Sequence, residues 1–299
     1  MKRFASFVML ALLALMSPVA FAQTQPSYQG LWWNAPGGSE SGWGLNIAHQ
    51  GSVLFVTWFT YDADGKGMWL VVPDAQLQPQ NNGMDGYGYG YGMGNPNMFE
   101  YMGTVYRTTG PAFNAATFNA SAVNVTAVGD ADFMFTSPDE GMFSYTVNGV
   151  AGSKAITRQV FSSMPTCSFG GAPGSFQDLW WKSPAGSESG WGVNITQQGA
   201  IMFVTWFTYG ADGKGMWLVA SDVRESAPGM WMGTLFSTSG PAFSVPAWDS
   251  TKVKATPVGT VMLMFDDMNS GTFTATVNGS TIDKAITRQV FAAPASACR

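Results

Sequence analysis

The feature that most constrains this chain is an internal duplication. The segment LWWNAPGGSESGWGLNIAHQGSVLFVTWFTYDADGKGMWLVV starts at Leu31, and a segment starting at Leu179 agrees with it at about three quarters of positions. Shorter matches follow in the same order: MGTVYRTTGPAF with MGTLFSTSGPAF, FSYTVNG with FTATVNG, and KAITRQVF in both halves. A repeat of this length is domain-sized rather than a solenoid unit. The repeat predicts two homologous domains, at residues 28–162 and 176–292. A turn-rich linker at residues 163–175 lies between them, and a short tail follows at residues 293–299.

Each copy has the pattern of an antiparallel β chain. Alternating, β-branched and aromatic runs are separated by tight turns such as Asp64-Gly65 and Asn148-Gly149. In the first copy, strand-like runs lie at residues 43–50, 52–61, 68–72, 99–108, 122–128, 131–136, 142–148 and 154–161. No stretch shows a sustained helical period. The pattern therefore predicts an all-β fold of about eight strands per copy, connected in sequence order.

An eight-strand meander can close on itself, which removes its exposed sheet edges. We expect two tandem antiparallel meander β-barrels in which the opening LWW segment pairs with the closing ITRQVF segment. Two β-sandwiches are the alternative. The layout resembles avidin- and lipocalin-like barrels as an architectural analogy, without a diagnostic motif of either family.

The strand VLFVTWFTY is apolar on both faces. Phe55, Thr57 and Phe59 point one way, whereas Val56 and Trp58 point the other. A barrel wall with one wet face would alternate between apolar and polar residues. We therefore expect the second face to be covered by the other domain, a partner subunit or a ligand.

Residues 1–22 have the pattern of a secretory signal peptide. A basic pair and a short apolar run precede a small-x-small cleavage site, Ala20-Phe21-Ala22, and the run is too short to span a membrane. We expect export to the periplasm or the medium, where disulfides form. Cys167 and Cys298 flank the second copy, so we expect a disulfide that clasps it at its own termini.

Composition argues against several functions. Charged residues make up 11% of the chain and the net charge is -5, without a basic run after residue 22, which argues against nucleic-acid binding. The one histidine, His49, is Gln197 in the second copy, which excludes a duplicated histidine triad or histidine-rich metal site. We read His49 as a surface or strand residue. The chain also lacks a recognisable nucleophile–base pair or nucleotide loop, so we expect no enzymatic activity, no cofactor and no metal.

The repeated carboxylates suggest turn and closure roles. Asp64 sits in a predicted hairpin turn, where aspartate is favoured for turn chemistry. Glu40 could pair with Arg158, and Glu188 with Arg288, because the first and last strands of a meander barrel are neighbours. The pair would fix the closure register, and a ligand-binding or catalytic role is the alternative.

The phrase GSESGWG, at residues 38–44 and 186–192, combines glycine, serine and a tryptophan. This mixture, placed at a barrel mouth, suits a sugar or a small aromatic ligand, and it also suits a tight structural corner. The repeated tryptophans suit a core as well as a binding face. The candidate ligand-binding residues are Ser39, Glu40, Ser41, Trp43, Trp58, Trp69 and Arg158, with Ser187, Glu188, Ser189, Trp191, Trp206, Trp217 and Arg288 in the second copy.

One segment, the insert at residues 78–98, occurs only in the first copy. Its Gly, Tyr, Asn and Met content favours a loop without a packed core, and its tyrosines could mediate self-association. Met84, Met93 and Met98 carry thioethers that ligate Cu(I), but no histidine or cysteine accompanies them.

The phrases SESGWG and TWFTYDADGK resemble an uncharacterised family of secreted bacterial repeat proteins. The resemblance covers both copies and implies no activity. We therefore expect an exported, non-enzymatic protein that binds a glycan or a small aromatic ligand. The alternatives are a self-associating structural protein of the cell surface or matrix, and an outer-membrane barrel suggested by low charge and aromatic strands.

Overall fold

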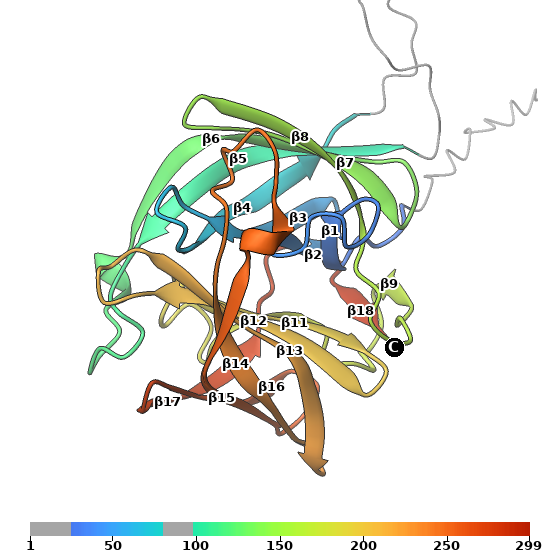
Figure 1. Cartoon of the computed structure of the whole chain (residues 1–299). Helices are drawn as coiled ribbons and strands as arrows, with labels where there is room; N and C mark the ends of the chain where they lie inside the picture. The colour runs from blue at the N-terminus through green and yellow to red at the C-terminus, as the bar shows by residue number, and fades with distance from the viewer. Residues whose placement is uncertain (1–24, 80–97) are drawn as a thin grey trace, which may run out of the picture.

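The computed structural model describes residues 25–79 and 98–299, and these form two closed antiparallel barrels of eight strands each (Figure 1). Barrel 1 consists of β1 (Gly30–Asn34), β2 (Gly44–Gln50), β3 (Val53–Tyr61), β4 (Gly67–Leu77), β5 (Phe99–Thr109), β6 (Asn124–Phe135), β7 (Glu140–Val147) and β8 (Val150–Arg158). Barrel 2 consists of β10 (Asp178–Lys182), β11 (Gly192–Gln198), β12 (Ile201–Tyr209), β13 (Gly215–Ala227), β14 (Met230–Ser239), β15 (Lys254–Phe265), β16 (Ser270–Val277) and β17 (Ser280–Arg288). The predicted all-β fold of two meander barrels is confirmed.

Each barrel closes by pairing its first strand with its last. Trp32 of β1 lies opposite Arg158 of β8, and Trp180 of β10 lies opposite Arg288 of β17. All neighbouring strands are otherwise consecutive in the chain. The expected contact between LWW and ITRQVF is therefore confirmed, and the alternative of two β-sandwiches is wrong because each sheet closes on itself.

One predicted pair of strands is a single strand. The runs at 122–128 and 131–136 form β6, which is continuous through Gly129, and the ladder with β5 shifts register between Val105 and Tyr106. Gly129 has a φ of 155°, and a Cβ there would lie 1.6 Å from the carbonyl oxygen of Thr146. The glycine therefore belongs to a bulge that bends the strand, not to a turn that ends it.

The interior of each barrel is filled by side chains, as an eight-strand barrel allows. The inward residues of β3 are Leu54, Val56 and Trp58, all buried. The largest buried side chains of the two interiors include Trp32, Tyr101, Phe133, Phe135 and Phe143 in barrel 1, and Trp180, Trp206, Trp231 and Phe273 in barrel 2.

A small two-stranded sheet joins the linker to the C-terminus. β9 (Cys167–Phe169) pairs with β18 (Ser296–Cys298), and a disulfide connects Cys167 to Cys298. The predicted disulfide is present, and the linker contributes one strand, β9, to this small sheet. In Figure 1 this sheet lies beside both barrels.

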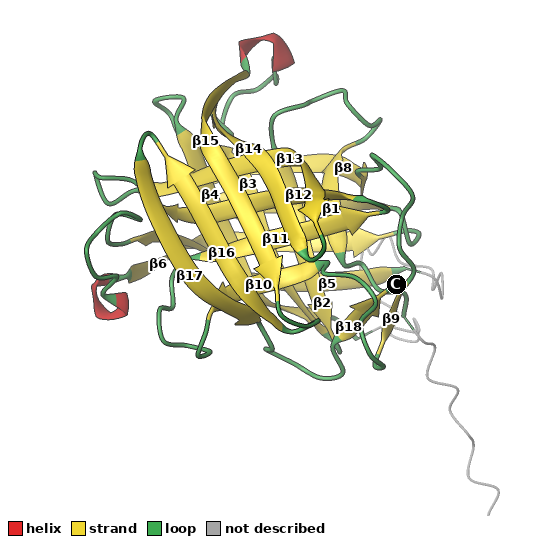
Figure 2. Cartoon of the chain, turned by 90° about the horizontal axis from the view of Figure 1, so that it is seen from below, coloured by secondary structure: helices red, strands yellow, loops and turns green. Residues whose placement is uncertain are grey.

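The two barrels pack against each other through the faces that contain β2–β4 and β11–β13, with β4 and β13 in contact, and their strands cross in Figure 2. Equivalent residues of the two copies make reciprocal contacts. Trp69 Nε1 donates to the carbonyl oxygen of Thr208 (2.9 Å), and Trp217 Nε1 donates to that of Thr60 (3.0 Å). The copies are thus related like the subunits of a twofold dimer, with the same patch used on both sides.

This packing explains the strand that is apolar on both faces. Phe59 contacts Phe207 and Trp217 of barrel 2, with ring centroids 6.4 and 5.5 Å apart. Thr57, on the same face, accepts a hydrogen bond from Asn194. Of the three covers that the sequence left open, the other domain is the one observed.

Candidate functional site

The GSESGWG loop folds over one end of its barrel and is held by its glutamate. The indole N–H of Trp43 donates to Glu40 (3.0 Å), and Lys154 donates to the same carboxylate. Lys154 Nζ also lies 5.1 Å from the centre of the Trp43 ring. The second copy repeats the arrangement, with Trp191 and Lys284 donating to Glu188.

The predicted pairing of Glu40 with Arg158 is therefore wrong, as is that of Glu188 with Arg288. Each glutamate does pair with a residue of the last strand of its barrel, but that residue is the lysine and not the arginine. Lys154 and Arg158 both face inward from β8, four residues apart, which separates them by about 13 Å along the strand. The lysine reaches the loop at one end of the barrel, and the arginine lies at the other end.

Arg158 closes the opposite end of barrel 1. Its guanidinium lies 4.8 Å from the centre of the Trp32 ring and donates to the carbonyl oxygens of Ser27 (2.6 Å) and Gln29 (2.7 Å). It forms an ion pair with Asp139 at 2.9 Å. The arginine side chain thus makes backbone hydrogen bonds and a stacking contact that connect the N-terminal segment to the barrel.

The glycines of the phrase allow the other barrel to approach. Gly42 and Gly190 have φ values of 115° and 121°. A Cβ on Gly42 would lie 2.5 Å from Val253 of barrel 2, and one on Gly190 would lie 2.7 Å from Val123 of barrel 1. The GSESGWG loop is therefore a tight structural corner, and the other copy packs directly against it.

Each barrel also receives a loop from the other over the same end. The loop after β5 places Phe113 against Trp206 of barrel 2 (5.3 Å), and the loop after β14 places Phe243 against Trp58 of barrel 1 (5.6 Å). The backbone N–H groups of these phenylalanines donate to the carbonyl oxygens of Tyr209 and Tyr61. We call residues 110–123 and 240–253 the exchanged loops; they include the short 3₁₀ turns Ala120–Ala122 and Ser250–Lys252.

Two glutamines complete the interface. Gln50 accepts from the backbone N–H groups of Phe291 and Ala292 (2.9 and 3.0 Å) and donates to the carbonyl oxygen of Gln289 (2.8 Å). Gln198 makes the corresponding three bonds to the segment after β8. The QVF that follows each arginine is therefore a contact with the other copy.

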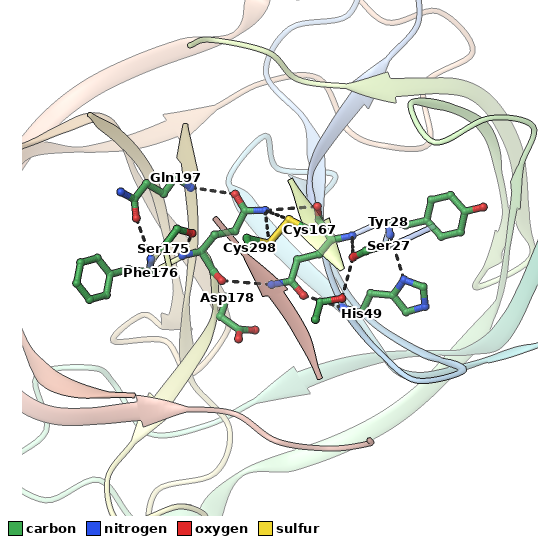
Figure 3. The surroundings of a disulfide bond; sticks show 12 residues. Ser27, Tyr28, His49, Cys167, Ser175, Phe176, Asp178, Gln197 and Cys298 are labelled. Atoms are coloured by element: carbon green, nitrogen blue, oxygen red, sulfur yellow. Dashed lines mark hydrogen bonds between the residues drawn. A yellow bond between two sulfur atoms is a disulfide. The ribbon is translucent and has the colours of Figure 1, made fainter. Parts of the chain in front are cut away.

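His49 is a buried residue of β2, so the prediction of a strand residue is confirmed and the alternative of a surface residue is wrong. Its Nδ1 accepts from the backbone N–H of Tyr28 (3.0 Å), and its Nε2 lies 3.1 Å from the hydroxyl of Tyr101. Burial lowers the pKa of His49 to about 3, so the ring is neutral. In barrel 2 Gln197 performs the same backbone contact by accepting from Phe176 N–H (2.8 Å), as Figure 3 shows beside the disulfide.

A groove of about 620 Å³ lies between the barrels, and aromatic and aliphatic side chains make up most of its lining. Neither an acidic nor a basic side chain is among the residues that line it. Barrel 1 supplies its outer face and barrel 2 supplies its GSESGWG loop and first strand. The principal lining residues are Phe55, Trp69, Val71, Tyr106 and Val125 from barrel 1, and Trp181, Ser189, Trp191 and Gln289 from barrel 2.

A second cleft, of about 480 Å³, lies where the two DADGK and GADGK turns meet. Asp64 accepts from the backbone N–H of Lys66 (3.1 Å), which confirms its predicted turn role. Its carboxylate lies 3.9 Å from both Lys66 and Lys214. The charged side chains here neutralise one another across the interface and offer no excess of either sign.

The candidate ligand-binding residues fall into four places: the groove, the barrel interiors, the cleft and the GSESGWG loop itself. Trp69, Ser189 and Trp191 line the groove, whereas Trp58, Trp206, Arg158 and Arg288 are buried or engaged inside the barrels. Trp217 lies in the cleft. The serines mostly brace the loop: Ser39 accepts from Asn34 (2.8 Å), and Ser41 and Ser189 donate to the carbonyl oxygens three residues before them.

Sequence reasoning missed the groove residues Phe55, Tyr106, Val125 and Trp181 and the interface role of the glutamines. A signal for the exchanged loops was present, because GPAF occurs unchanged in both copies. The first-copy insert and the signal peptide lie, but for residues 78, 79 and 98, outside the described residues, and their predicted roles stay predictions.

No family model, curated protein or solved structure matches this chain. The resemblance to secreted bacterial repeat proteins therefore stays a prediction. Within residues 25–79 and 98–299, no helix is long and apolar enough to cross a membrane, and no group of three or more His, Cys, Asp or Glu side chains is placed to hold a metal ion.

Proposed function

We propose that this chain is an exported, non-enzymatic binding protein whose ligand is a small, uncharged, largely aromatic molecule held in the groove between the barrels. The groove itself is the observation that carries the proposal. Its volume of about 620 Å³ lies within the range typical of small-molecule sites, and aromatic and aliphatic side chains with a few polar groups are the usual lining of such sites. The disulfide supports an oxidising compartment.

The lining favours an aromatic ligand over a glycan. Phe55, Tyr106 and Trp181 offer ring surfaces, while Ser189 and Gln289 supply polar groups at one side. A sugar would need many more hydrogen-bonding groups to replace the water it loses. The filled barrel interiors direct the proposal to the groove rather than to a lumen of the lipocalin or avidin kind.

The test is a titration of the intrinsic tryptophan fluorescence with a panel of small aromatic compounds and a panel of oligosaccharides. We expect saturable changes with members of the aromatic panel, because Trp69, Trp181 and Trp191 line the groove. Saturation by oligosaccharides alone would replace the aromatic ligand with a glycan. A flat response to both panels would overturn the proposal.

A matched pair of variants locates the site. Val125 lines the groove and is 62% exposed, whereas Val160 is 61% exposed and lies outside it. We expect Val125→Arg to weaken binding at least tenfold, because it puts a charge into an apolar groove. Val160→Arg should leave binding unchanged, and equal effects of the two variants would count against the groove.

A further inference from the structure

Methionines collect on the outer face of barrel 2, on two adjacent strands. Met230 and Met232 lie on β14, and Met262 and Met264 lie on β15. The residues between them, Trp231 and Leu263, are buried in the barrel, so the methionines point outward by the alternation of a strand. Met232 is 43% exposed and Met264 is 40% exposed.

The strand register places the four methionines in a rectangle. Met230 lies opposite Met264, and Met232 lies opposite Met262. Directly opposite Cβ atoms on antiparallel strands are about 5 Å apart, and residues two apart along one strand are separated by about 7 Å. The methionine side chain has three rotatable bonds, so its sulfur can move by several ångströms toward a common centre.

We propose that this rectangle binds one soft monovalent cation, Cu(I) or Ag(I), through the thioether sulfurs of Met230, Met232, Met262 and Met264. Soft thioether ligands select Cu(I) over hard and borderline cations such as Ca²⁺ and Zn²⁺. The proposal is independent of the groove, which is lined by other residues.

The surroundings of the rectangle suit a neutral thioether site. Its neighbours in register on β16 are Thr272 and Thr274. On β13 Arg224 lies opposite Met232, and its charge is compensated by Asp222 at 2.7 Å. The rectangle lies near the β13–β14 turn, at the far end of the strands from the exchanged loop that contacts barrel 1 (Figure 1).

Barrel 1 provides an internal contrast. The positions that correspond to Met230 and Met262 are Glu100 and Asp132, while Met102 and Met134 are retained. Met142 lies opposite Met134 on the neighbouring strand. Barrel 1 therefore lacks the two facing methionine pairs between its fifth and sixth strands, and hard carboxylate oxygens take their place.

The experiment uses Ag(I) as a redox-stable probe, added as the nitrate in chloride-free buffer to the full-length mature chain. Calorimetry should give one equivalent of Ag(I) on barrel 2. The methyl signals of the four methionines should shift in a spectrum of the chain labelled with [methyl-¹³C]methionine. Cu(I) supplied under anaerobic conditions should compete with Ag(I), whereas Zn²⁺ should not. The described cysteines are joined in the disulfide and offer no thiolate.

Two double variants decide between the sites. Met232→Leu with Met264→Leu keeps the apolar volume and should weaken Ag(I) binding at least tenfold. Met102→Leu with Met134→Leu should leave that equivalent in place. Retention of full affinity in the barrel 2 variant, loss of it in the barrel 1 variant, or absence of Ag(I) binding by the unmodified chain would each overturn the proposal.

Discussion

Barrel 1 and barrel 2 have equivalent arginines where the barrel closes, Arg158 and Arg288, but the carboxylates that compensate their charges lie at different positions. In barrel 2 Arg288 pairs with Asp178 of the first strand at 2.9 Å. Barrel 1 has Gly30 at the position of Asp178, and Arg158 pairs instead with Asp139 in the turn between β6 and β7. The position that corresponds to Asp139 in barrel 2 is Asn269, so each barrel supplies one carboxylate.

The difference teaches that the fold requires a compensated guanidinium rather than a carboxylate at a fixed position. Both arginine side chains are 9% exposed and stack on a tryptophan, but their partners are not alike. The side chain of Asp139 is 65% exposed, whereas that of Asp178 is 5% exposed. The same contact should therefore contribute differently to the stability of the two barrels.

The largest expected effect tests this comparison. Asp178→Asn should lower the free energy of unfolding by about 3–5 kcal/mol, because it leaves a buried arginine without its counter-charge. Asp139→Asn should cost about 1 kcal/mol or less, because the carboxylate of Asp139 is 65% exposed and water screens its attraction to Arg158. Chemical denaturation of both variants measures the difference, and equal costs would show that burial of the partner does not matter here.

A second prediction uses the difference between His49 and Gln197. Folded His49 stays neutral down to about pH 3, whereas the unfolded chain protonates it below about pH 6.5. The unfolded state then binds more protons, so the free energy of unfolding falls as the pH drops through this window. Between pH 7 and pH 4.5 this histidine should account for a loss of about 2–3 kcal/mol.

The control for this prediction is His49→Gln, which gives barrel 1 the residue of barrel 2. The variant should be less sensitive to acid than the unmodified chain by that amount, as measured by denaturation at the two pH values. Identical acid sensitivity in both chains would mean that His49 is not the group responsible.

The smallest effect concerns the contacts that the barrels share. Trp69→Phe and Trp217→Phe each remove one indole N–H bond to a carbonyl of the other barrel and should each cost about 1 kcal/mol. Because the two bonds are equivalent, the two costs should agree. Thermal denaturation measures both, and a clear inequality would show that the twofold relation is broken at this contact.

The sequence predicted the features that depend on local pattern. Strand periodicity, turn residues and the repeat gave the two meanders, and the placement of LWW and ITRQVF gave their closure. The partner of Glu40 was missed because Lys154 and Arg158 belong to one repeated phrase, and sequence alone does not tell which end of a strand meets a given loop.

The groove could not be predicted, because it exists only in the packing of one copy on the other. Trp181 and Tyr106 are far apart in the chain and belong to different barrels. The strand that is apolar on both faces predicted that another element covers its outer face. It did not predict how the second barrel is oriented on the first. The interface glutamines resembled ordinary strand residues, since their partners are backbone groups of the other copy.

The exchanged loops have a consequence for how such a chain matures. Translation delivers the N-terminal half first. The strands of barrel 1 can be complete while Trp58 still lacks Phe243, which comes from the half that is synthesised later. Until the second half of the chain supplies Phe243, the aromatic residues at this end of barrel 1 therefore stay exposed to their surroundings.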